Sequence, residues 1–199
     1  MAKLNRQETE ARIHQLTEAE DFASAAELTL QLYGDELLGY LMGTLQDRTA
    51  VEDVFQNLNL EMWRALPRFE WRSSLRTWIY MIARGVLSKH LRDPYRRRGA
   101  PLLTADEAAL PMRLARTATR TWRKTESKDR LWTICEQLPT EDRELLMLRI
   151  GRKMNWKDIA AIFTDDEADK AELRRTSARL RKRYERLKDQ LRDQMLGDT

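Results

Sequence analysis

The chain has 199 residues, of which 34% are charged, and it carries a net charge of +4 with an isoelectric point near 9.3. This length allows one large or two small domains with packed cores. The single cysteine, Cys135, excludes an intrachain disulfide and is typical of a protein in a reducing compartment. No apolar run resembles a signal peptide or reaches the roughly 18 residues of a membrane span. We therefore expect a cytoplasmic protein with no membrane insertion of its own.

The first part of the chain changes from polar to apolar. Residues 1–24 form a polar N-terminal extension, in which Ile13 and Leu16 are the only sizeable apolar pair at helical spacing, so either a marginal helix or a frayed extension is expected. Apolar residues then become dense as far as Leu45, and Gly34 and Asp35 predict a break between two helices in this segment. No alternating pattern that would indicate a β-strand occurs. An all-α fold is therefore expected.

The segment 51–66 has the periodicity of a helix that faces a core. Its apolar stripe consists of Val51, Val54, Phe55, Leu58, Met62 and Leu66. A second face of the same helix mixes acidic, amide, aliphatic and basic groups, which suits a protein partner. This face consists of Asp53, Gln56, Asn57, Leu60 and Arg64.

A second helix follows the loop 68–74, where Ser73 or Ser74 is the expected N-cap. Its apolar side consists of Trp78, Ile79, Ile82 and Val86. Arg76, Tyr80 and Arg84 lie on another side, and the helix runs into a basic block that ends at Arg98. Aromatic rings interleaved with arginines on an exposed face favour single-stranded nucleic acid, because bases stack on the rings and phosphates are attracted to the cations. Trp78 fits a plain core residue equally well.

These two helices carry a family resemblance. The segment 52–84 reads EDVFQNLNLEMWRALPRFEWRSSLRTWIYMIAR and resembles the second conserved domain of bacterial sigma-70 family initiation factors, in the extracytoplasmic-function (ECF) subgroup. The matching positions are Glu52, Asp53, Gln56, Leu60, Trp63, Arg76, Thr77, Trp78, Tyr80, Ile82, Ala83 and Arg84. The chain departs from the family pattern at Asn59, where an aromatic residue is usual, and at Gly85, where asparagine is common.

Residues 93–125 have the composition of a linker, with scattered Pro, Gly, Thr and Arg. A helix that begins near Ser127 is expected to bury an apolar set made of Leu131, Ile134, Cys135 and Leu138. Pro139 and Thr140 then start another helix, which Gly151 is expected to close as a C-cap. The C-terminal unit is therefore expected to begin near residue 127.

The segment 154–163 begins with a strong helix start signal. Asn155 is the expected N-cap, Asp158 completes a variant capping box, and Met154 and Ile159 occupy the hydrophobic-staple positions. This short helix has the form of the first helix of a helix-turn-helix motif. The residues LPTEDRELLMLRIGRKMNWKDIAAIF, at 138–163, resemble the fourth conserved domain of the same family.

The next helix is expected to read DNA. Its inner face consists of Leu173, Leu180, Tyr184, Leu187 and Leu191, and a basic stripe consists of Arg175, Arg179, Lys182 and Arg186. The turn before it, residues 164–170, is acidic and has no glycine. Either this turn is longer than the usual three to four residues or the helix starts early with an acidic first turn. Such carboxylates favour a helix N-terminus but repel phosphate.

The resemblance implies two small helical domains and a function. It divides the chain into the extension 1–24, sigma domain two at 25–98, a linker at 99–126 and sigma domain four at 127–199. It implies binding to core RNA polymerase through the beta-prime and beta subunits, recognition of minus-ten and minus-thirty-five promoter elements, and DNA melting. An anti-sigma factor is a further implied partner.

The site residues are carried over from the same resemblance. Core polymerase would be bound by Asp53, Gln56, Asn57, Leu60 and Arg64. The minus-ten element would be held by Arg68, Trp71, Arg72, Ser73, Arg76, Thr77, Trp78, Tyr80 and Arg84. The minus-thirty-five element would be read by Arg174, Arg175, Arg179, Lys182 and Arg183.

Other classes of function fit less well. The chain has no phosphate-binding glycine loop, no metal-binding H-E-x-x-H or C-x-x-C and no nucleophile elbow, so we expect no enzyme, no cofactor and no metal. A stand-alone helix-turn-helix regulator remains open, although it has no need of the RSSLRTWIYMIAR segment. A sigma-like adaptor that binds polymerase without recognising a promoter also remains open because of the acidic turn.

Overall fold

The computed structural model describes residues 5–45, 47–92, 137–164 and 168–197, and everything below refers to these ranges. They are helical throughout, apart from turns and short connections, and they contain no strand, which confirms the all-α prediction. The predicted linker and the helix expected from Ser127, with Cys135, lie outside the described residues. No helix within the described ranges is long and apolar enough to cross a membrane.

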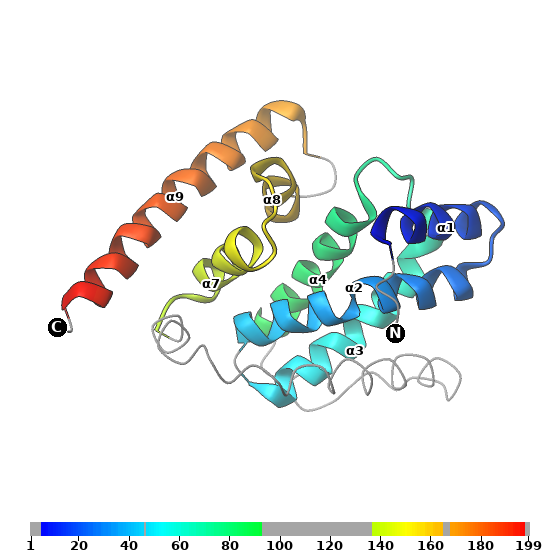
Figure 1. Cartoon of the computed structure of the whole chain (residues 1–199), viewed down its shortest axis with the longest axis horizontal. Helices are drawn as coiled ribbons and strands as arrows, with labels where there is room; N and C mark the ends of the chain where they lie inside the picture. Colours follow the sequence, from blue (N-terminus) through cyan, green and yellow to red (C-terminus); the bar gives the residue numbers. More distant parts are fainter. Residues whose placement is uncertain (1–4, 46, 93–136, 165–167, 198–199) are drawn as a thin grey trace.

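The N-terminal unit consists of α1 (Arg6–Glu18), α2 (Phe22–Leu45), α3 (Arg48–Ala65), the short η1 (Leu66–Arg68) and α4 (Leu75–Arg92). As Figure 1 shows, α2 runs through the middle of this unit, with α1, α3 and α4 packed around it. The predicted stripe of α3 is buried and meets α2 and α4 in one core, in which Tyr33, Leu37 and Ile79 are fully enclosed. The prediction of a core-facing helix at 51–66 is confirmed.

One prediction for the first part of the chain is wrong. Gly34 and Asp35 do not break the helix, because Gly34 is buried near the ring of Phe55 and packing continues on both sides of it. An interior glycine costs only about 1 kcal/mol, which tertiary burial outweighs. Of the two alternatives for the extension, the structure has the helix, α1, because Ile13 and Leu16 are buried in the core that α2 completes.

The local start signals are confirmed. The Ser74 hydroxyl accepts a hydrogen bond of 3.0 Å from the backbone N–H of Thr77 at the beginning of α4. At the start of α8 (Trp156–Phe163), the Asn155 side chain accepts a hydrogen bond of 2.9 Å from the N–H of Asp158 and donates one of 2.7 Å to its carboxylate. These bonds satisfy groups that a helix N-terminus leaves unpaired.

The C-terminal unit consists of α7 (Thr140–Leu146), the π-helical turn η3 (Met147–Gly151), α8 and α9 (Lys170–Gly197). The prediction of a Gly151 C-cap is wrong, because the left-handed residue is Lys153, with φ of 53°. The connection to α9 is the longer of the two alternatives left open by the sequence, since α9 begins only at Lys170. Asp169 accepts a hydrogen bond of 2.6 Å from the N–H of Glu172 and starts this helix.

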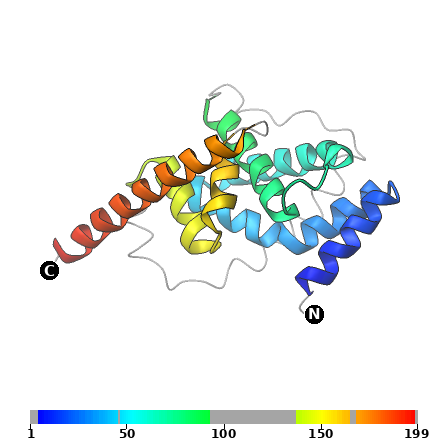
Figure 2. The same ribbon diagram turned by 90° about the horizontal axis from the view of Figure 1, so that it is seen from above.

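The two units pack against each other. In Figures 1 and 2, α7 and α8 lie against α2 and α4, whereas α9 crosses the outer side of α8 and extends away from the N-terminal unit. The contact brings residues near position 40 together with residues near position 144. Two arginines of the predicted nucleic-acid face, Arg76 and Arg84, lie in this region.

Candidate nucleic-acid interface

The loop between η1 and α4 holds a cluster of aromatic rings. The rings of Phe69 and Trp78 stack with centroids 4.4 Å apart, and Trp71 lies 4.7 Å from Phe69. Trp71 also makes an edge-on contact with the His14 ring of α1, at 4.4 Å between centroids. Trp71 has φ of 57°, a left-handed conformation that is strained for a bulky residue. The contacts of its ring with Phe69 and His14 therefore hold the loop in a defined shape.

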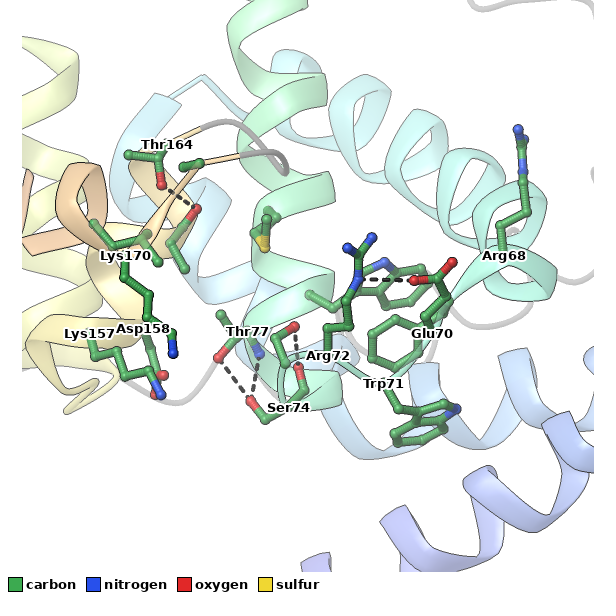
Figure 3. Close-up of a pocket in the computed structure, with 17 residues that line it drawn as sticks. Arg68, Glu70, Trp71, Arg72, Ser74, Thr77, Lys157, Asp158, Thr164 and Lys170 are labelled. Carbon is green, nitrogen blue, oxygen red and sulfur yellow. Dashed lines mark hydrogen bonds and ion pairs between the residues drawn. The ribbon is translucent and has the colours of Figure 1, made fainter.

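A cavity of about 820 Å³ opens beside this cluster, between the loop and the C-terminal unit (Figure 3). Arg68 and Arg72, which are exposed, line it from the loop, with Ser73, Thr77 and Trp78 on the same side. Lys157 and Lys170, from α8 and α9, line the opposite side. Nucleobases can stack on exposed aromatic rings, and phosphates are attracted to the cations on the two sides of the cavity.

The arginines predicted to lie on the exposed face of α4 are instead paired. Arg76 binds Glu36 of α2 and donates a hydrogen bond of 2.8 Å to the carbonyl oxygen of Arg152. Arg84 forms an ion pair of 3.5 Å with Glu144 of α7 and lies 4.2 Å from the ring centre of Phe163. Their side chains are only about one-fifth exposed, so the prediction of an exposed arginine face is wrong in this arrangement.

Tyr80 and Thr77 are buried as well. Burial, reinforced by the Glu36 carboxylate, raises the pKa of the Tyr80 hydroxyl above its ordinary value. The Thr77 hydroxyl shares a hydrogen bond of 2.8 Å with Ser74. The prediction of an exposed Tyr80 ring is wrong, because this ring packs edge-on against Tyr40 in the core. Of the rings predicted at this interface, Trp71 and Trp78 are the accessible ones, and both are half-buried.

The second cationic surface lies on α9. The exposed basic residues of this face are Arg174, Arg175, Arg179, Lys182 and Arg186. Arg183, which was predicted with them, lies on the inner side and binds Glu141 and Asp142 of α7. Leu180 and Leu187 are buried on that inner side, as predicted. The exposed stripe follows one face of α9, which is the arrangement that a helix needs to meet a phosphate backbone.

The face of α3 that was predicted to bind a protein partner is partly accessible. Asp53, Gln56 and Asn57 are half-buried, Arg64 is exposed, and Leu60 is buried. Trp63 is 43% exposed on the same helix, although the site prediction left it out. The sequence held a signal for Trp63, because this tryptophan lies outside the apolar stripe of the helix and aromatic residues are enriched in protein interfaces. No group of His, Cys, Asp and Glu that could hold a metal ion occurs among the described residues.

Comparisons with known proteins match the two units of the chain to different family models. Residues 29–98 match the family model described as sigma-70 region 2, and residues 139–195 match one described as a Myb-like DNA-binding domain. The RNA polymerase sigma-H factor of Pseudomonas aeruginosa is 26% identical over 144 residues, which cover 70% of this chain and 75% of that protein. No solved structure matches the chain.

Two mycobacterial proteins are also similar. The probable RNA polymerase sigma-C factor of Mycobacterium bovis and the ECF RNA polymerase sigma factor SigC of Mycobacterium tuberculosis are each 34% identical to the chain over 118 residues. The matched segment covers 59% of this chain and 60% of each of these two proteins.

A helical core with an aromatic loop, followed by a helix-turn-helix with a cationic outer stripe, defines a helical DNA-binding protein. These matches support a sigma-70 family RNA polymerase sigma factor of the ECF subgroup, through residues 29–98 for the family model and through 118 to 144 residues for the named relatives. This agrees with the family that the sequence motifs indicated.

Proposed function

We propose that the chain is an ECF-type sigma factor that binds core RNA polymerase, recognises minus-ten and minus-thirty-five promoter elements and promotes DNA melting. The match of residues 29–98 to sigma-70 region 2 is the observation that carries this proposal. The named relatives are RNA polymerase sigma factors, which supports polymerase and promoter DNA as the partners. The expected place of action is the cytoplasm, with the polymerase.

The polymerase-binding surface is assigned to the accessible side of α3. Asp53, Gln56, Asn57 and Arg64 supply polar contacts, and Trp63 supplies an aromatic anchor of the kind that dominates binding energy in protein interfaces. Leu60 supports this surface from beneath, because it is buried. An anti-sigma factor that covers this surface would silence the chain.

The minus-ten element is assigned to the loop 68–74 and the start of α4. Melted bases stack on Trp71 and Trp78, while Arg68 and Arg72 attract the phosphates. Unstacking a base step costs a few kcal/mol, and capture of the freed bases offsets that cost. The minus-thirty-five element is assigned to the outer stripe of α9, in the major groove. Neither task needs a catalytic group, so we propose a non-enzymatic role.

The deciding experiment is transcription in vitro, with the purified full chain, core bacterial RNA polymerase and fragmented genomic DNA. Sequencing of transcript 5′ ends is expected to find starts that depend on the chain and share two upstream motifs. Polymerase binding without new starts would favour the adaptor. Promoter binding without polymerase binding would favour the stand-alone regulator.

A further inference from the structure

We infer that His14 of α1 is a positioning residue for the minus-ten loop, because its ring holds the Trp71 ring in an orientation in which a melted base can stack on it. This inference rests on the proposed function of the loop 68–74, and it adds a residue from far outside the segment to which that function is assigned. His14 itself need not touch DNA. In Figure 3 the Trp71 side chain extends from the loop toward the faint blue ribbons of the N-terminal helices.

The backbone at Trp71 needs support from side chains. Its φ of 57° is a conformation that a bulky residue rarely adopts. The backbone hydrogen bonds of this connection end at the N–H of Phe69 and resume at the carbonyl oxygen of Ser74. Within the described residues, the backbone of Glu70, Trp71 and Arg72 makes none. The Glu70–Arg72 ion pair lies at the surface, where it adds little. Packing of the Trp71 ring therefore decides the shape of the loop.

His14 is carried by a helix that is fixed to the core. Ile13, its neighbour in the chain, is fully buried, and Leu16 is buried one turn further on. Tyr33 of α2 donates a hydrogen bond to Glu10, one turn before His14. A side chain on such a helix is held more precisely than one on a loop. The helix therefore supplies a fixed ring against which the loop can be set.

Four rings form a continuous series from α1 to α4. The His14 and Trp71 centroids are 4.4 Å apart and the ring planes are inclined by 66°, which is the edge-on geometry that aromatic pairs prefer. Beyond Trp71 the series continues through Phe69 to Trp78, at 4.7 Å and then 4.4 Å. His14 thus supports the first ring of a series that ends at the second candidate stacking ring.

This support acts on strand capture. A ring that is already held in place binds a base more tightly, because less conformational freedom is lost on binding. Trp71 is half-buried, so part of its ring stays accessible to a base. Without the His14 ring, Phe69 is the remaining ring contact of Trp71, and the loop can leave its strained conformation. The effect is expected on single-stranded DNA and not on duplex DNA bound by α9.

The test compares three substitutions in the full chain. His14→Ala removes the ring, whereas His14→Phe keeps an aromatic ring and has no imidazole. Gln15→Ala changes the next position of α1, which is exposed, and is the control. Circular dichroism during heating measures the stability of each variant, and all binding is compared at a temperature at which every variant is folded.

The orientation of Trp71 is measured by fluorine nuclear magnetic resonance after incorporation of fluorinated tryptophan. The chain has six tryptophans, and the resonance of Trp71 is assigned by its loss in Trp71→Phe. His14→Ala is expected to shift or broaden this resonance, and Gln15→Ala is expected to leave it unchanged. An unchanged Trp71 resonance in His14→Ala would overturn the positioning role.

Strand capture is measured without polymerase, by fluorescence anisotropy with labelled, random-sequence single-stranded DNA at low salt. His14→Ala is expected to bind this DNA about threefold to tenfold more weakly than the natural chain, which is the equilibrium factor that one edge-on aromatic contact supplies. His14→Phe and Gln15→Ala are expected to bind as the natural chain does. Because phenylalanine has no charge, recovery in His14→Phe would assign the effect to ring packing, and an equal loss there would contradict it.

A double-mutant cycle separates this inference from the proposed function. In a Trp71→Ala background, His14→Ala should cause no further loss of strand affinity, because the ring that it positions is absent. The same loss in that background would show that His14 acts apart from Trp71, which overturns the inference. If Trp71→Ala alone binds the strand as tightly as the natural chain, the proposed function of the loop is contradicted, while the Trp71 resonance still reports whether His14 positions this ring.

Discussion

The guanidinium of Arg183 in α9 binds the carboxylate of Asp142 in α7, and its Nη1 atom lies 2.6 Å from Oε2 of Glu141. The hydrogen bond from Arg183 holds the pKa of Glu141 below its ordinary value. The Asp142 side chain is only 12% exposed. This arginine therefore fixes the orientation of α9 from its inner side, while Arg179 and Lys182 on the outer side stay exposed.

We expect Arg183→Ala to lower the free energy of unfolding by about 1–3 kcal/mol, because Asp142 is left largely buried without its partner. Urea denaturation measures this change. Arg179→Ala is the control, since that side chain is exposed, and it should change stability by no more than about 0.5 kcal/mol. Equal stability of the two variants would contradict the anchoring role of Arg183.

Arg179→Ala should instead change DNA binding. Each neutralised phosphate releases counterions, so the slope of log affinity against log salt should become shallower by about 1 for duplex DNA. A salt titration with a duplex promoter fragment measures the slope. Arg48→Ala, which removes an exposed positive charge from α3, should leave it unchanged. Equal slopes for both variants would remove Arg179 from the proposed DNA surface.

Arg72→Ala tests the minus-ten loop. The Arg72 side chain is 80% exposed and forms a surface ion pair with Glu70, so its loss should not measurably change stability. Binding of single-stranded DNA should weaken at low salt, with a salt slope shallower by about 0.7. Arg92→Ala, an exposed change at the far end of α4, is the control. An equal loss in the control would show an effect of net charge alone.

Glu144 should make stability depend on pH. Burial raises the pKa of its carboxyl above the ordinary 4.5, although Arg84 and the Tyr40 hydroxyl oppose this, and Glu141 adds to it. The folded protein therefore holds this proton more tightly than the unfolded chain does. As pH rises from about 4.5 through the raised pKa, the stability of the natural chain should fall relative to Glu144→Gln, and the difference should then level off. Urea denaturation at several pH values measures this, and a pH-independent difference would contradict the assignment.

The sequence predicted those features that depend on residues close together in the chain. The capping box at Asn155 and Asp158 and the N-cap at Ser74 each depend on residues within one turn, and the core stripe of α3 depends on the spacing of residues along one helix. Local hydrogen bonding and helical periodicity determine such features, so they can be predicted from a single sequence. The family motifs of α3 and α4 have the same local character.

The sequence could not predict the features that depend on distant partners. Whether Gly34 breaks α2 depends on the packing of α3, and whether Arg84 is free depends on Glu144, sixty residues further along the chain. The same is true of Tyr80, whose burial against Tyr40 no local pattern records. Exposure of the α4 face was therefore predicted wrongly, although its residue types were recognised correctly.

The edge-on contact between His14 of α1 and Trp71 also bears on how the protein can be divided. A fragment trimmed to the family match, residues 29–98, would start inside α2 and lack α1 completely. It would lose the His14 contact of the strained Trp71 and expose core residues that Ile13 and Leu16 help to bury. Such a fragment is expected to aggregate, because exposed apolar surface promotes association between molecules. The segment that the family model matches is thus shorter than the helical unit that packs around one core.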